Sequence, residues 1–312
     1  MTDNNLTPAP PVNGTIRAER VAKQRKDYWG ITAILVSFLV LGGFVILGSI
    51  AVALVAIANV VSSGSIDTSN ATQITDDLLS NPWVIIGGTV PMYVAWVICA
   101  VWLSKYRSGV PSRFKTTWEA FKHNFWLTKT RWYDVFIGLG IAILFVLLQT
   151  LVMFVLPILF PDFDTSTTDN TGPFANMEGI AFFLIGFGIV GFLGPIMEEL
   201  FFRGLLLRGL LNRFDKSRAL KTEYNVDAKE GWFYKHRAFI VVLITSIIFG
   251  MFHFQSPTAG SIVIVLITGS LGFGLGMMTL KLNRAAPSMY AHAFHNTIAI
   301  VALTAEKYFS AN

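Results

Sequence analysis

A handful of ionisable side chains interrupt the otherwise apolar stretches of this 312-residue chain. They are Glu198, Glu199, Arg203, Arg208, His253, His292 and His295. A titratable group inside a bilayer is costly, so its presence there is by default a sign of function. Carboxylates and imidazoles are also the side chains that move protons to and from water. We therefore expect any chemistry of this protein to lie with these residues.

The acidic pair follows Pro195, where we predict a helix to begin because proline is well tolerated in a first turn. Glu199 and Arg203 are four residues apart, so they share a helix face and can form an ion pair. Glu198 points about 100° away and lacks that partner. It is our candidate for the carboxylate that activates a water molecule. The alternative is that both glutamates serve only an ion-paired helix cap.

Histidines supply the other candidate groups. His253 lies among aromatic residues, a setting that is also typical of a hydrogen-bonded core histidine. His292 and Asn296 are four residues apart and share a helix face, with His295 on the neighbouring ridge. An imidazole and a carboxamide can supply two donors to an oxyanion, or one metal ligand and its orienting partner. Hydrogen bonding between helices is the alternative for this pair.

The amino-acid composition indicates that these residues lie in a membrane protein. Only 14% of the residues are charged and 53% are hydrophobic, whereas about 25% are charged in ordinary soluble domains. The hydrophobic residues form blocks near the length that a helix needs to cross a bilayer. The excess of 24 Lys and Arg over 19 Asp and Glu is explained by topology, so we expect the bilayer and no nucleic acid as a partner.

Seven apolar blocks are present, at about 31–61, 83–103, 134–159, 179–211, 238–254, 261–280 and 286–305. The block 179–211 is too long for one straight crossing, and Gly194-Pro195 within it predicts a break. The sequence therefore predicts an all-α, polytopic transmembrane bundle of seven or eight helices.

Charges near the ends of the blocks predict the orientation. Segments 1–30, 104–133 and 212–237 hold five, seven and seven Lys and Arg, whereas 62–82 and 160–178 hold none. Basic residues are retained on the cytoplasmic side, so we expect a flexible basic cytoplasmic tail over 1–30 and a multi-pass protein of the plasma membrane. The endoplasmic reticulum is the alternative if the source is eukaryotic.

The predicted depths of His253 and His292 in the membrane do not agree. On this topology His253 lies about 15 residues into its helix, or roughly 22 Å, whereas His292 lies only a few residues after the 281–285 turn. Helix tilt, the predicted break at Gly194-Pro195, or a deeper start of the last helix would reconcile the two depths.

Together these residues resemble the CAAX protease and bacteriocin-processing (CPBP) family of intramembrane endopeptidases, which includes the type II CAAX prenyl endopeptidase. The family's motifs are E-E-x-x-x-R, F-x-x-x-H and H-x-x-x-N. They are matched, in order, by Glu198-Glu199 with Arg203, by Phe249 with His253, and by His292 with Asn296. The resemblance covers about 179–305.

The resemblance implies hydrolysis of a peptide bond near the membrane surface, with Glu198 and His253 activating water. His292 and Asn296 would bind the oxyanion. Glu199 would complete this catalytic set, supported by Arg203 and Phe249. We favour a mechanism without a cofactor, although family members have also been described as metalloproteases. The candidate ligands for a zinc ion would be Glu198, His253 and His292.

The expected organisation is a cytoplasmic tail (1–30), N-terminal transmembrane helices (31–178) and a catalytic membrane domain (179–305). The expected partner is a peptide or protein substrate that enters from the membrane; the oligomeric state stays open. A non-catalytic immunity or scaffold protein on the same fold is the first alternative. The second is an ion-coupled transporter, in which a broken helix at Gly194-Pro195 would bind ions.

Overall fold

The computed structural model describes residues 31–63, 82–107, 117–164, 168, 179–214, 232–254 and 257–310. The predicted tail 1–30 and parts of the predicted loops lie outside these residues. Within them all regular structure is helical and no strand occurs. The helices are α2 (Ile31–Ser63), α4 (Pro82–Arg107), α5 (Thr117–Asn124), α6 (Asp134–Leu159), α8 (Gly179–Phe182), η3 (Phe183–Leu193), α9 (Gly194–Glu199), η4 (Leu200–Leu207), α11 (Trp232–Lys235), α12 (Arg237–Met251), α13 (Ala259–Leu282) and α14 (Ala286–Ser310).

Three of the described helical runs are long and apolar enough to cross a membrane: Asp134–Leu159, Phe183–Phe214 and Ala259–Leu282. Shorter apolar stretches lie within α2 (Ile34–Gly48) and α4 (Thr89–Trp102), and α12 (Arg237–Met251) is a shorter apolar helix. Many of the large apolar side chains of α6 are exposed, as expected for a helix that lies against lipid tails. The protein is an integral membrane protein with an all-α helical bundle, as the sequence predicts.

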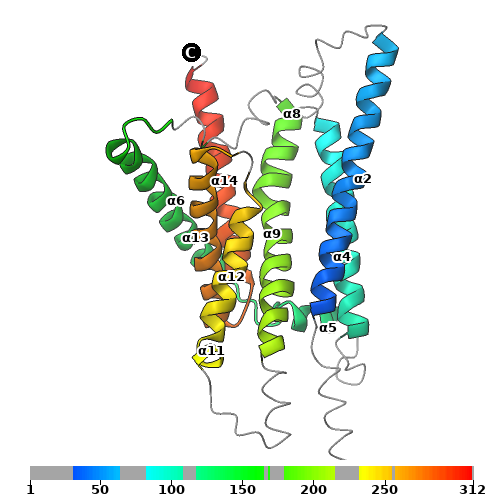
Figure 1. Ribbon diagram of the computed structural model, residues 1–312, viewed down its shortest axis with the longest axis vertical. Coiled ribbons are helices and arrows are strands. Elements are labelled where there is room, and N and C mark those ends of the chain that lie inside the picture. The colour runs from blue at the N-terminus through cyan, green and yellow to red at the C-terminus, as the bar shows by residue number, and fades with distance from the viewer. Residues whose placement is uncertain are drawn as a thin grey trace, which may run out of the picture.

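One long helical run, from α8 to η4, lies between two groups of helices (Figure 1). On one side α2 packs against α4; on the other α12 packs against α13, and α14 packs against both α6 and the long run. Figure 1 places α5 and α11 at one end of the bundle and α8 and the C-terminus at the other. The chain thus alternates between the two ends in the manner that the loop charges predict.

The long run remains helical through Gly194-Pro195, so the predicted break is wrong, and the eight-helix count that depended on it loses its basis. The π-helical segments η3 and η4 flank the short α9. A π-helix pairs each N–H with the carbonyl five residues back, and the Gly194 N–H accordingly bonds to the Ile189 carbonyl. In this register Val190 would receive its hydrogen bond from residue 195, but proline has no N–H. The run therefore remains helical at the proline, and the Val190 carbonyl is left without a donor from its own helix.

The turn between α13 and α14 is buried in the protein. Arg284 and Ala285 are both shielded from solvent, and the Ala285 N–H donates to the Trp126 carbonyl, just beyond α5. Because α14 begins inside the bundle, His292 reaches the ring of Phe249, one helical turn before His253. A deeper start of the last helix is therefore the arrangement that brings the two histidines together.

Candidate active site

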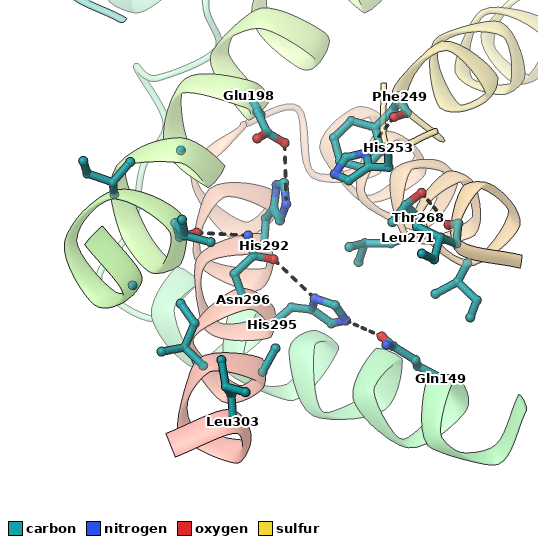
Figure 2. A pocket seen from close by; sticks show the side chains of 18 of the residues that line it. Gln149, Glu198, Phe249, His253, Thr268, Leu271, His292, His295, Asn296 and Leu303 are labelled. Atoms are coloured by element: carbon teal, nitrogen blue, oxygen red, sulfur yellow. Dashed lines mark hydrogen bonds and ion pairs between the residues drawn. The ribbon is translucent and has the colours of Figure 1, made fainter. Parts of the chain in front are cut away.

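A cavity of about 460 Å³ lies within the bundle, between the long helical run, α4, α6, α12, α13 and α14. Among its lining residues are six that the sequence selects as candidates: Glu198, Phe249, His253, His292, His295 and Asn296. Figure 2 shows the Glu198 and His292 side chains meeting across this space, with His253 on the opposite wall. Residues from three separate segments of the chain thus converge on one space, as the sequence predicts.

The two neighbouring glutamates occupy different environments. Glu199 is fully buried and its Oε2 lies 3.1 Å from Nε of Arg203, which is the predicted pairing across one helical turn. The side chain of Glu198 is 33% exposed and faces the cavity. Glu198 is therefore the carboxylate that a water molecule or a substrate can reach.

His292 stands between these two carboxylates. Its Nδ1 lies 3.3 Å from Oε1 of Glu199, and its Nε2 lies 3.8 Å from Oε2 of Glu198. The ring itself is almost completely buried. Arg203, Glu199, His292 and Glu198 thus form one continuous chain of charged or titratable groups that ends in the cavity.

Arg203 anchors the buried end of that chain. Its Nη2 donates to the Gly272 carbonyl of α13 at 3.2 Å, and its guanidinium lies 5.2 Å from the ring centre of Phe249. The Phe249 ring also contacts the rings of His253 and His292, at centroid distances of 5.1 and 5.5 Å. Phe249 is therefore a spacer that sets the positions of three functional side chains.

His253 lies in the turn directly after α12, and not on the helix as the sequence suggested. Its Nδ1 lies 3.0 Å from the Phe249 carbonyl. A carbonyl only accepts, so Nδ1 carries the proton and, in the neutral ring, Nε2 is free to accept a second one. The end of α12 thus selects the tautomer that a general base requires.

Asn296 uses the carbonyl that Pro195 leaves without a donor. Its side-chain nitrogen donates to the Val190 oxygen at 3.1 Å, and the Thr297 hydroxyl donates to the neighbouring Gly191 oxygen at 3.4 Å. The predicted alternative of hydrogen bonding between helices is therefore present. Since a carboxamide has two N–H groups, the second one still remains for a molecule in the cavity.

Two polar lining residues were missed from the sequence because only acidic, basic and histidine side chains in the apolar blocks were taken as candidates. Tyr93 of α4 and Gln149 of α6 both face the cavity, and Gln149 is polar within a strongly apolar helix. A second cavity of about 270 Å³ lies next to the first and shares Tyr93, Glu198 and His253 with it. A search for any polar residue within an apolar block would have selected both residues.

The zinc site that the sequence leaves open requires three ligands that converge on one point. Among the residues that the structure describes, no three His, Cys, Asp or Glu side chains converge closely enough to hold a metal ion. The set predicted for zinc, Glu198, His253 and His292, lines one cavity without forming such a group. In this arrangement the three residues do not fit a three-ligand zinc site.

A family model for type II CAAX prenyl endopeptidase Rce1-like proteins matches residues 180–298. The matched region contains all three motifs and excludes Tyr93 and Gln149. No curated protein and no solved structure matches the chain. The resemblance drawn from the three motifs is confirmed, because residues 180–298 are similar to the Rce1-like type II CAAX prenyl endopeptidases.

Proposed function

We propose that this protein is an intramembrane endopeptidase in which Glu198 is the general base that activates the attacking water. The family supports a protease of the CAAX type. The observation that carries the assignment is the contrast between two adjacent glutamates: Glu199 is closed off by Arg203, whereas Glu198 opens into a cavity. Of the two, only Glu198 has access to a substrate.

In the proposed reaction a water molecule lies between Glu198 and His253. Glu198 removes a proton as the water oxygen attacks the peptide carbonyl carbon, while His253 accepts the second hydrogen bond of the water. The amide bond then breaks as the proton held by Glu198 passes to the leaving nitrogen. Proton transfer by a positioned side chain contributes roughly 10²–10⁴-fold to the rate. Two acceptors at the water explain why both residues would be needed.

His292 and Asn296 are the proposed donors to the oxyanion that forms on the carbonyl oxygen. His292 would donate from Nε2, and Oε1 of Glu199 lies 3.3 Å from the other ring nitrogen, Nδ1, where it helps to orient the ring. The Asn296 amide is fixed by its bond to Val190. Fixed donors need no rearrangement when the charge develops, which is the source of their effect.

The proposal extends to substrate and location. The substrate is a peptide or protein that enters from the bilayer, and the catalytic part of the chain is 179–305. We propose a plasma-membrane protein with its basic N-terminus in the cytoplasm, or an endoplasmic reticulum protein in a eukaryote. The continuous helix through Gly194-Pro195 removes the feature that suggested a transporter.

The test is cleavage of two quenched-fluorescent peptide libraries, with and without a C-terminal prenylcysteine, by the purified protein in detergent. We expect the wild type to cut one library and Glu198→Gln to be slower by about 10²–10⁴-fold. Glu306→Gln, an exposed change on α14, is the matched control and should cut normally. Cleavage that survives a chelator supports the mechanism without zinc, and loss of cleavage that added zinc restores contradicts it.

Equal cleavage by the wild type and Glu198→Gln would contradict the role of this carboxylate. No cleavage of either library by any variant would contradict the protease assignment and favour a non-catalytic immunity or scaffold protein on this fold.

A further inference from the structure

One polar cluster in the cavity has no part in the proposed reaction. His295 of α14 and Gln149 of α6 both line the cavity, in the half away from Glu198 (Figure 2). Nε2 of His295 lies 3.1 Å from the side-chain oxygen of Gln149. A half-buried polar pair inside a membrane bundle is costly unless its hydrogen bonds are made, so its presence calls for a role.

The pair continues to Asn296. Nδ1 of His295 lies 3.5 Å from the side-chain oxygen of Asn296, as the dashed lines in Figure 2 show. The side-chain nitrogen of Asn296 in turn donates to the Val190 carbonyl at 3.1 Å. The cluster therefore runs from α6 through α14 to the long helical run, and it ends at the carbonyl that Pro195 leaves without a helical donor.

These contacts determine which way the Asn296 amide faces. A carboxamide has one oxygen and two N–H groups. The oxygen faces His295 and one N–H is bonded to Val190. The bond to Val190 holds the amide nitrogen, and the His295 ring lies beside the amide oxygen, so this orientation is favoured and the second N–H has one preferred direction.

We propose that His295, held by Gln149, is a positioning residue that fixes the Asn296 amide so that its free N–H is presented to the oxyanion. This inference rests on the proposed function, and it adds two residues, one of them outside the region that the family model matches. His295 does not touch the reacting atoms: it acts through Asn296 alone.

The test is a double-mutant cycle on the library peptide that the wild type cuts fastest. Loss of one oxyanion donor costs roughly 10²–10³-fold in kcat, which we expect for Asn296→Ala. His295→Leu should lower kcat by about tenfold with KM within about twofold, because misplacement of a catalytic group slows the chemical step. His295→Gln, whose amide can still donate, should recover most of this loss. In the Asn296→Ala background, His295→Leu should have no further effect, because both changes act on one interaction.

A second readout is independent of cleavage. The chain has only five histidines, so nitrogen NMR of histidine-labelled protein can follow the His295 ring. Its signals should shift in Gln149→Leu and in Asn296→Ala, and they should stay in place in Thr304→Val, a control on the same helix whose hydroxyl bonds only to the Ile300 carbonyl.

The outcomes separate the two proposals. Normal kcat in His295→Leu, a multiplied loss in the double variant, or unmoved His295 signals in Gln149→Leu would overturn the positioning role while leaving the protease assignment intact. A wild type that cuts neither library would overturn the proposed function and the positioning role with it.

Discussion

Two buried ion pairs among the described residues differ in what surrounds their carboxylates. Asp134 at the start of α6 and Arg284 before α14 meet at 2.8 Å. The second oxygen of Asp134 accepts from the backbone N–H of Arg131 at 2.9 Å, so this pair is closed on itself. The pair of Glu199 and Arg203 has similar burial, but its free carboxylate oxygen faces His292.

The difference shows where chemistry is possible. In the pair of Asp134 and Arg284, both carboxylate oxygens already accept hydrogen bonds, so neither is available to a ligand. The second pair continues through His292 to Glu198, which is 33% exposed to the cavity. The two pairs are similarly buried, but the second leads through His292 to a carboxylate that a ligand can reach.

The largest effect on stability should follow removal of one member of the open cluster. Arg203→Met leaves Glu199 buried without its partner, which we expect to cost about 3–5 kcal/mol in the free energy of unfolding. Replacing both residues by methionine should recover most of this loss, because an apolar pair often substitutes well for a buried ion pair. Thermal unfolding in detergent measures both, with the exposed Arg213→Met as control. A double variant as unstable as the single one would contradict this explanation.

A smaller effect should follow at the closed pair. Asp134→Asn removes the charge but keeps an oxygen that can accept from Arg131, so we expect a loss of about 1–3 kcal/mol. The kcat of the molecules that remain folded should equal that of the wild type, because the pair is not part of the site. The exposed Asp162→Asn is the control. Reduced kcat at unchanged stability would show that the closed pair also takes part in function.

The sequence predicted the site better than the contacts around it. Spacing alone places Glu199 and Arg203 on one face, because positions four apart are neighbours on any helix. No such rule links Asp134 to Arg284, which are 150 residues apart. Their pairing also means that Arg284 is a buried structural residue.

Two predictions about individual helices were wrong for physical reasons. Proline was expected to break the long helix because an α-helical register requires its N–H. The π-helical register still leaves one carbonyl, that of Val190, without a helical donor, and the side-chain nitrogen of Asn296 from another helix donates to it. Likewise, nothing in the apolar sequence around His253 indicated that α12 ends at Met251 and leaves the histidine in a turn.

The most direct test of the central claim compares two substitutions of the same kind on adjacent residues. Glu198→Gln and Glu199→Gln would be assayed for peptide cleavage and for melting temperature in one series. We predict that Glu198→Gln loses about 10²–10⁴-fold in cleavage at an unchanged melting temperature, whereas Glu199→Gln melts at a clearly lower temperature because Arg203 loses its partner. Normal cleavage by Glu198→Gln, together with an inactive but stable Glu199→Gln, would contradict the account.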